Sequence, residues 1–304
     1  FDLRSPATSW VLASTPRGVF AEAEEINNLQ YGMNRAHINW YRIDQGVRTS
    51  SPGSNESVYT RLVSQQEIFR NRTTQLGLND FRTFDVTYYP YERGPYNFDV
   101  PDGGSPWSAG MDRTNCRLLE PSQRWGGIMR SLNQTNFEQA NIEALEFWVL
   151  DPFYYDSVGG NKGTIVFQLG NISEDILKDS RKFFEHGLPL GPEDPTPVDT
   201  TVWGKIPRIP ATVNAFSNTT GGRERQDVGL DGLNSQEETA FFSDYLSKLQ
   251  MTIENATCLQ EIQRDPSGDD FTYFLDETAF PNGASLFERY HDYTGPEGNS
   301  PPRQ

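Results

Sequence analysis

The sequence contains no long apolar run. Its longest uninterrupted apolar stretches are four residues each, Trp10–Ala13 and Phe147–Leu150, whereas a membrane-spanning helix needs about twenty. We therefore expect no lipid-spanning segment in this chain. Basic residues are also scarce, because 26 Lys and Arg stand against 42 Asp and Glu, a net charge of −16. This excess argues against nucleic acid or an anionic membrane surface as a partner, since both carry phosphate.

Histidine and cysteine are rare, with three and two residues. No G-x-S-x-G elbow and no H-E-x-x-H motif occurs, which argues against a Ser-His-Asp hydrolase or a zinc protease. Cys116 and Cys258 are too few for a cysteine zinc site or a disulfide framework. A single bridge between them and two separate buried thiols both stay open, because spacing alone does not show whether their Cβ atoms meet.

Aromatic residues are abundant, with 19 Phe, 13 Tyr and 6 Trp, as expected of a chain that folds. The 26 glycines and 20 prolines cluster between short apolar stretches, which is typical of an all-β protein. Apolar and polar residues alternate with period two in several segments, which predicts strands with one buried face. These segments are residues 36–41, 84–88, 164–169 and 271–275. Residues 147–150 are apolar on both faces, which predicts a central strand buried from both sides.

Two segments have the signals of helices laid on a sheet. One begins at Ser173 and stops at Gly187, with acids in its first turn and bases late. The other begins at Ser235, with Glu238 at capping-box spacing. Its apolar stripe consists of Phe241, Phe242, Tyr245, Leu246 and Leu249. We expect a mainly β fold: an N-terminal β segment over residues 1–110, then a jelly-roll-like β-sandwich with two short helices over 111–304, ending in a linker.

Two acidic loops are candidate calcium sites. The first offers Asp227, Asp231 and Asn234 around two glycines, and the second offers Asp265, Ser267 and Asp269. Oxygen ligands at close intervals suit a hard cation such as Ca²⁺, although neither loop has EF-hand spacing. The alternative is that both are polar turns whose carboxylates accept backbone N–H bonds. No other cofactor is expected.

Two other functions stay open. Trp107, Trp125 and Trp203 lie beside Gly or Pro in expected loops, where they would form a sugar-binding platform of a carbohydrate-binding module or else plug the ends of the sandwich. The 42 acids also allow a glycoside hydrolase, which needs two converging carboxylates. Glu143 and Glu146 do not fit that role, because residues three apart in a strand face opposite sides.

Several longer runs extend over nearly the whole chain, and the run over residues 88–99 is the most distinctive. These runs are FDLRSP at 1–6, YGMNRA at 31–36, WYRID at 40–44, YYPYERGPYNFD at 88–99, WGGIMR at 125–130, NFEQANIE at 136–143, EFW at 146–148, GNISEDILKDSRKFFE at 170–185, VWGK at 202–205, QDVGLDG at 226–232, RY at 289–290 and GPEGNSP at 295–301. Together they resemble the SprA/Sov family, the outer-membrane translocon of the type IX secretion and gliding-motility system of the Bacteroidetes.

The resemblance implies that this chain is an internal segment of a much longer protein that forms a very large outer-membrane β-barrel. It implies a part in protein export across the outer membrane and in gliding motility, with no chemical reaction and no catalytic residues. The implied partners are the remainder of the translocon barrel, a PorV-type shuttle protein and a plug protein. The implied location is the outer membrane, on its periplasmic or cell-surface side, where an oxidising environment permits the Cys116–Cys258 bridge.

Overall fold

The expected β-sandwich is not present. The computed structural model describes residues 2–4, 6–51, 57–71, 80–101, 103–132, 134, 136–212, 215–281 and 283–294, so the expected C-terminal linker lies outside the described residues. The structure is 23% helical and 12% strand, and its strands form small two-stranded sheets. The prediction of a mainly β jelly roll with two helices is therefore wrong.

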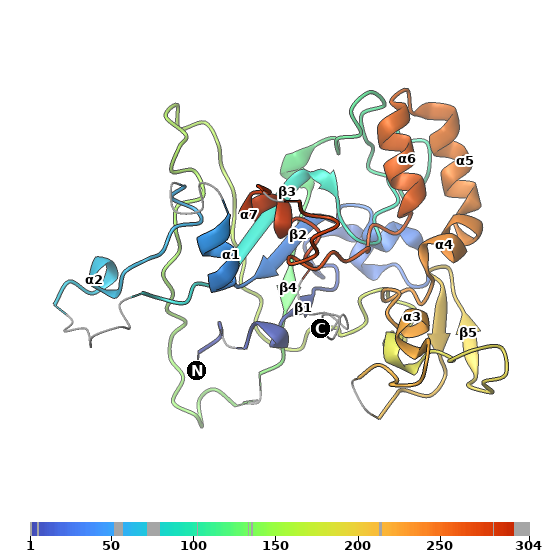
Figure 1. The fold of residues 1–304 in the computed structure, drawn as a ribbon, viewed down its shortest axis with the longest axis horizontal. Coiled ribbons are helices and arrows are strands. Elements are labelled where there is room, and N and C mark those ends of the chain that lie inside the picture. Colours follow the sequence, from blue (N-terminus) through green and yellow to red (C-terminus); the bar gives the residue numbers. More distant parts are fainter. Residues whose placement is uncertain are drawn as a thin grey trace.

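Three antiparallel pairs make up the strand structure of the described residues. The longest joins β2 (Ala36–Tyr41) to β3 (Asp85–Arg93) at the centre of the molecule (Figure 1). The register of this pair shifts between Ala36 and His37. The two shorter pairs are β1 (Val11–Leu12) with β4 (Ile128–Met129), and β5 (Val198–Thr200) with β6 (Lys205–Pro207).

Helices are short and lie mainly in the C-terminal half. The α-helices are α1 (Gln45–Ser50), α2 (Gln65–Ile68), α3 (Gly222–Gln226), α4 (Ser235–Phe241), α5 (Ser243–Thr252), α6 (Ala256–Arg264) and α7 (Leu286–Arg289). The 3-10 turns are Ala7–Ser9, Ala21–Glu24, Leu29–Gly32, Pro121–Gln123 and Glu185–Gly187. Helices α4, α5 and α6 stand together at one end of the molecule, and α2 lies at the other (Figure 1). No described helix has both the length and the apolar character needed to cross a bilayer.

One hydrophobic core joins the central strands to the C-terminal helices. Trp40 of β2, Phe98 and Trp203 are fully buried. The Phe98 ring lies 4.6 Å from that of Phe242 and 5.2 Å, edge-on, from that of Tyr245 (centroid distances). Because this core takes residues from both 1–110 and 111–304, the expected boundary at residue 110 does not coincide with a break in the core.

Two of the expected strands form, although their faces differ from the prediction. Every residue of β2 is buried, whereas the alternation predicted one exposed face. In β3 the residues expected to face the core, Val86 and Tyr88, are exposed. Burial in this two-stranded ladder is therefore decided by the other parts of the chain that pack on each residue, and not by the period-two pattern.

The expected strands at 147–150, 164–169 and 271–275 are absent. Residues 145–150 and 164–169 belong to no helix, turn or strand and lie outside any ladder, and we call them the apolar arms. They lie on the side of the molecule away from α4–α6 (Figure 1). Phe147, Trp148 and Val149, expected to be buried from both sides, are 54%, 74% and 60% exposed. An alternating pattern makes a strand only where a partner supplies ladder hydrogen bonds.

The expected helix from Ser173 to Gly187 is also wrong. That segment consists of irregular chain, turns and the 3-10 turn Glu185–Gly187. In one of the turns a side-chain oxygen of Asp175 accepts the Ser180 N–H. The second expected helix exists as α4 followed by α5. Its N-cap is Asn234, which forms a capping box with Glu237 rather than with Glu238. The predicted stripe is buried except for Phe241, which is 37% exposed.

Candidate metal centre

The two acidic loops predicted as separate calcium sites meet in one cluster. Ser267 of the second loop donates its Oγ–H to Asp231 Oδ2 of the first loop across 2.6 Å. One oxygen each of Asp231, Glu238 and Asp269 lie within 4.8 Å of one another. We call these three carboxylates the acidic cluster. Two oxygens bound to one Ca²⁺ at about 2.4 Å lie at most about 4.8 Å apart, so this separation fits a shared calcium ion.

Helix α4 supplies the third carboxylate, that of Glu238, for which the sequence pattern predicted a place in a capping box. Since Asn234 is the N-cap, Glu237 occupies the capping position and Glu238 turns inward. Glu238 is 1% exposed and accepts the Ser267 N–H through Oε2 at 3.0 Å. The sequence did contain a signal for this, because Glu238 lies four and seven residues before Phe242 and Tyr245, on the buried side of the helix.

The carboxylates are held in place by neutral donors. Asp231 Oδ1 accepts the Leu233 N–H at 2.9 Å. Asp269 Oδ2 accepts the Tyr96 hydroxyl at 2.8 Å, and the same Tyr96 oxygen accepts the Leu230 N–H at 2.7 Å. Tyr96 therefore connects the two loops, a role that no motif in the sequence indicated. Because all these donors are neutral, they orient the carboxylates without cancelling their charge.

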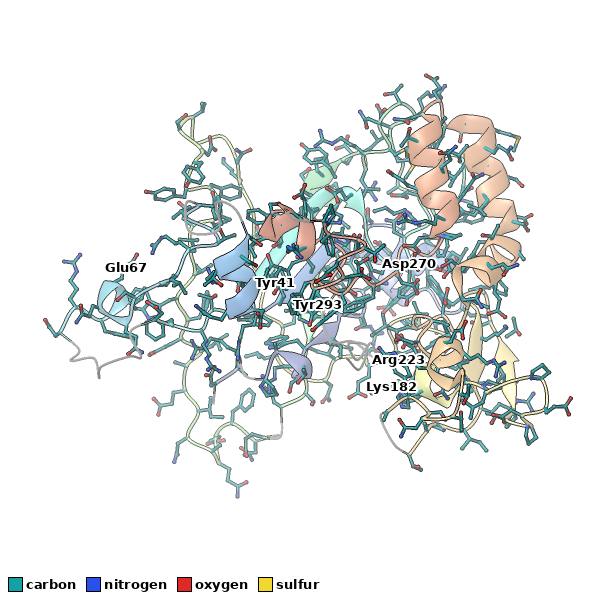
Figure 2. All side chains as sticks on the ribbon, viewed as in Figure 1. Tyr41, Glu67, Lys182, Arg223, Asp270 and Tyr293 are labelled. Atoms are coloured by element: carbon teal, nitrogen blue, oxygen red, sulfur yellow. A yellow bond between two sulfur atoms is a disulfide. The ribbon has the colours of Figure 1, made fainter. Side chains whose placement is uncertain are left out.

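Two further acids of the second loop lie beside the cluster. One oxygen each of Asp265, Asp269 and Asp270 also lie within 4.8 Å of one another. Asp265 accepts backbone N–H groups of residues 268, 269 and 270, so the loop folds around it. Asp270 is placed where the central body meets the helical end of the molecule (Figure 2). Its pKa rises to about 6, through burial and the nearby Asp265 carboxylate.

Burial and mutual repulsion strongly perturb the acidic cluster. Burial, followed by the charge of Glu238, raises the pKa of Asp231 well above its ordinary value. Burial and the charge of Asp231 do the same to the pKa of Asp269. Burial raises the pKa of Glu238 to about 7. A bound cation or retained protons would relieve this repulsion.

No described cation makes a direct ion pair with these acids. Arg93 lies nearby, but its guanidinium donates to the backbone carbonyls of Asp265 and Asn97, among others, rather than to a carboxylate. The ion pairs found among the described residues lie elsewhere on the chain. The negative charge of the cluster is therefore not neutralised by a neighbouring side chain.

The remaining candidate residues have other contacts. Asp227 forms an ion pair with Arg223, 2.7 Å away and one helical turn earlier, and does not belong to the acidic cluster. Asn234 uses its side-chain oxygen to cap α4, accepting N–H groups of Gln236 and Glu237. Only Asp231, Asp265, Ser267 and Asp269 of the six predicted ligands come together.

Cys116 and Cys258 are joined by a disulfide in the structure, with their Cα atoms 6.5 Å apart. The bond connects the loop around residue 116 to α6. Asn255, the N-cap of α6, also donates to the Thr114 carbonyl at 3.0 Å. Two independent contacts therefore hold this loop against the helical end.

The tryptophans considered for a sugar platform are largely enclosed. Trp203 is fully buried and Trp125 is 8% exposed. Trp107 is partly buried, and Lys248 Nζ lies over its ring, 4.6 Å from the centroid. No observation among the described residues therefore favours a platform of these three rings.

Comparison with protein-family models and with curated proteins finds no match for this chain.

Proposed function

We propose that this chain is a structural and interaction segment of an outer-membrane protein-export translocon of the SprA/Sov type, and that it catalyses no reaction. The resemblance of its longer runs to that family supports the assembly in which we place it. Its partners would be the remainder of the translocon barrel, a PorV-type shuttle protein and a plug protein. It would lie on the periplasmic or cell-surface side of the outer membrane and support secretion and gliding.

The observation that carries the proposal is the exposure of the apolar arms. Ile165, Val166 and Phe167 are 61%, 66% and 52% exposed, comparable to the residues of the first arm. The Phe147 and Phe167 rings lie 4.9 Å apart between centroids, so the arms approach each other there. Contiguous exposed apolar surface of this kind marks a binding surface in a folded protein.

The backbone of the arms is also available for pairing. Within the described part of the chain, no backbone–backbone hydrogen bond involves residues 143–150 or 162–172. Backbone N–H and C=O groups without backbone partners are the groups that pair with an added strand in β-augmentation. We therefore propose that strands from the remainder of the translocon pair with the arms and cover their apolar side chains.

A cation in the acidic cluster would fix the arrangement of the C-terminal loops. Calcium fits best among common cations, because the atoms available to bind the cation are carboxylate and hydroxyl oxygens. The proposed role is mechanical, since a bound ion would lock the loop at 227–234 to the loop at 265–270. This part of the proposal has its own test, given in the Discussion.

The arms can be tested in the complete translocon in cells. Trp148→Ser combined with Val166→Ser should reduce cargo secretion at least tenfold, because each substitution removes an apolar side chain that the partner strands would cover. Val19→Ser is a matched control, since Val19 is 63% exposed and lies outside the arms. It should leave secretion within twofold of the wild type. Unchanged secretion by the double variant, at equal amounts of translocon in the membrane, would refute the proposal.

A second measurement covers variants that fail to accumulate. A photo-crosslinking amino acid at position 166 should form an adduct with the remainder of the translocon or with one of its partners, whereas the same probe at position 19 should not. Absence of an adduct from position 166 in a secreting translocon would also overturn the proposal.

A further inference from the structure

The two apolar arms and their connection touch at two places. The Phe147 and Phe167 rings lie 4.9 Å apart between centroids, with an interplanar angle of 48°. A Cβ built on Gly163 would lie 3.4 Å from the Phe153 ring, so that ring packs on the Gly163 backbone. Between the two contacts the residue numbers rise from 147 to 153 on one side and fall from 167 to 163 on the other. The arms therefore run antiparallel to each other.

The backbone of each arm is compatible with a strand. No residue of 145–150 or 164–169 lies in a turn or a bend. The positive φ angles nearest to the arms are those of Asn141, Gly159 and Gly170, which lie outside both arms. Each arm can therefore straighten into a strand without moving any of its residues out of the left-handed region.

The connection between the arms, residues 151–163, is already folded. The Asp156 carboxylate accepts the N–H groups of Gly159 and Asn161 at 3.1 and 2.8 Å. The Tyr59 hydroxyl donates to the Pro152 carbonyl at 2.9 Å and holds the connection against an earlier part of the chain. Because this connection has already lost conformational freedom, closing the arms on each other costs less than closing a flexible loop of the same length.

Placing Phe147 directly opposite Phe167 would sort the side chains of the arms by polarity. Alternate residues of a strand share a face, and so do directly opposite residues of a pair. One face would be entirely apolar and consist of Leu145, Phe147, Val149, Ile165, Phe167 and Leu169, which are between 40% and 62% exposed in the structure. The other face would be mixed and consist of Glu146, Trp148, Leu150, Thr164, Val166 and Gln168. A slip of one residue would break up the apolar face, which favours this pairing.

We propose that the apolar arms close into an antiparallel β-hairpin, with Phe147 opposite Phe167, when the remainder of the translocon docks on them. This inference rests on the proposed function, because a two-stranded hairpin alone in water is marginally stable and needs a cover for its apolar face. Pairing of the arms uses the backbone groups on their facing sides. The groups on their outer sides stay available to the strands from the remainder of the translocon.

Disulfide formation between introduced cysteines tests the hairpin in the complete translocon. Glu146→Cys combined with Gln168→Cys places two thiols directly opposite each other on the mixed face. Two controls keep Glu146→Cys and combine it with Val166→Cys or with Thr164→Cys, which displaces the second thiol along its strand. Opposite Cβ atoms in a sheet lie about 4.5–5.5 Å apart and displaced ones farther, whereas a disulfide needs about 3.5–4.5 Å. The two native cysteines are joined to each other and do not compete.

Under mild oxidation, the 146–168 disulfide should form in about fivefold more molecules than either control pair. It should also form about fivefold faster in the translocon than in the purified chain, where nothing covers the hairpin. An equal or larger yield for a control pair, or equal rates in the translocon and the purified chain, would overturn the proposal. Leu150→Cys combined with Thr164→Cys has the same register and replaces the first pair if Glu146→Cys prevents accumulation of the translocon.

The disulfide and the photo-crosslink from position 166 separate the hairpin from the proposed function. An adduct from position 166 without a 146–168 disulfide would refute the hairpin alone. The 146–168 disulfide without such an adduct would support the pairing of the arms and refute the partner contact of the proposed function.

Discussion

Arg124 and Asp99 form an ion pair that is completely enclosed by protein. The distance from Arg124 Nη1 to Asp99 Oδ2 is 2.5 Å, and both side chains are 0% exposed. The guanidinium also donates to the backbone carbonyls of Leu119, Met33 and Gly110. A single buried side chain thus fixes three loop segments, which is how a chain with so little ladder structure keeps its loops in place.

Removing the cation of this pair should strongly destabilise the protein. Arg124→Met leaves the Asp99 carboxylate buried without its partner, which costs about 3–5 kcal/mol in comparable cases. Urea unfolding followed by tryptophan fluorescence measures the loss. Arg17→Met is the control, because Arg17 pairs with Glu24 on the surface, and its unfolding midpoint should hardly move. Equal midpoints for the two variants would contradict the structural role of Arg124.

Calcium should stabilise the protein through the acidic cluster. Ca²⁺ at one hundred times its dissociation constant would add about 2.7 kcal/mol to the free energy of unfolding, and EDTA should remove that gain. Asp231→Asn should abolish the response to Ca²⁺, yet raise the melting temperature in EDTA by relieving repulsion. Asp227→Asn, outside the cluster, should respond to Ca²⁺ like the wild type. A wild-type melting temperature that neither Ca²⁺ nor EDTA changes would refute the calcium site.

Without metal, the stability of the cluster should depend on pH. The pKa of Glu238 is raised to about 7, so in the folded protein Glu238 binds a proton that the unfolded chain does not bind above pH 5. The free energy of unfolding should therefore rise as pH falls from 8 to 5 in EDTA. Glu238→Gln should have a shallower slope, and the difference between the two slopes isolates this residue from the histidines. Identical slopes would contradict the raised pKa.

Saturating Ca²⁺ should change the sign of that contribution. A cation binds the ionised carboxylates, so protons compete with it. The stabilisation by Ca²⁺ should decrease as pH falls from 8 to 5. Calorimetric titrations at both ends of this range measure the effect, and equal Ca²⁺ affinities at the two pH values would indicate that the ion binds elsewhere.

The disulfide should contribute substantially to stability. It joins residues 142 positions apart, so in the unfolded chain it closes a long loop and removes much conformational freedom. Cys116→Ala combined with Cys258→Ala should lower the free energy of unfolding by about 2–5 kcal/mol. Urea unfolding of the variant and of the reduced wild type should agree. A change within measurement error would show that the loop is held by other contacts, such as those of Asn255.

The sequence by itself determined the features that depend on neighbouring residues. The start of the helical segment near residue 235 and most of its apolar stripe follow from capping chemistry and a 3.6-residue period. The alternation at 36–41 marked a strand that does form. The oxygen-rich loops around Asp231 and Asp269 were also visible, because such turns are specified by their own Asp, Ser and Gly residues.

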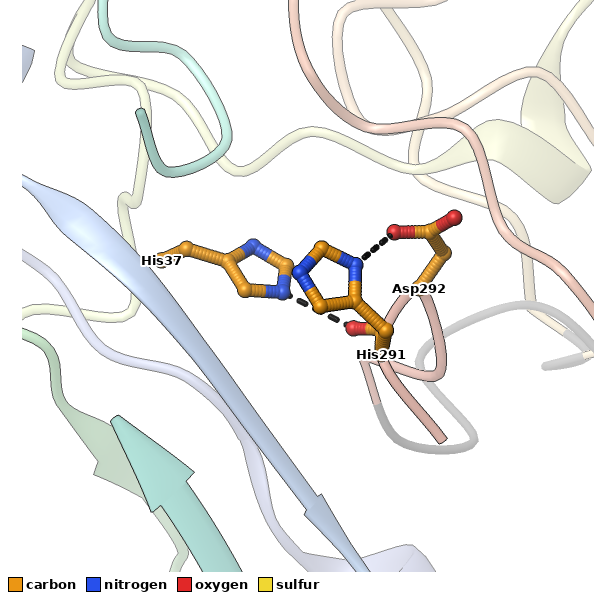
Figure 3. A group of neighbouring side chains, drawn as sticks. All are labelled: His37, His291 and Asp292. Atoms are coloured by element: carbon orange, nitrogen blue, oxygen red, sulfur yellow. Dashed lines mark hydrogen bonds and ion pairs between the residues drawn. The ribbon is translucent and has the colours of Figure 1, made fainter. Parts of the chain in front are cut away.

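Only the tertiary structure decided which of these features meet. Asp231, Glu238 and Asp269 converge because α4 folds back beside the second loop, and no local pattern encodes that approach. Residues 147–150 and 164–169 carry patterns as strong as that of β2, yet they have no ladder in this chain, because a strand needs a hydrogen-bonding partner and alternation does not supply one. The stacking of His37 on His291 (Figure 3) likewise brings together residues that are 254 positions apart in the sequence, and no local pattern specifies such a contact.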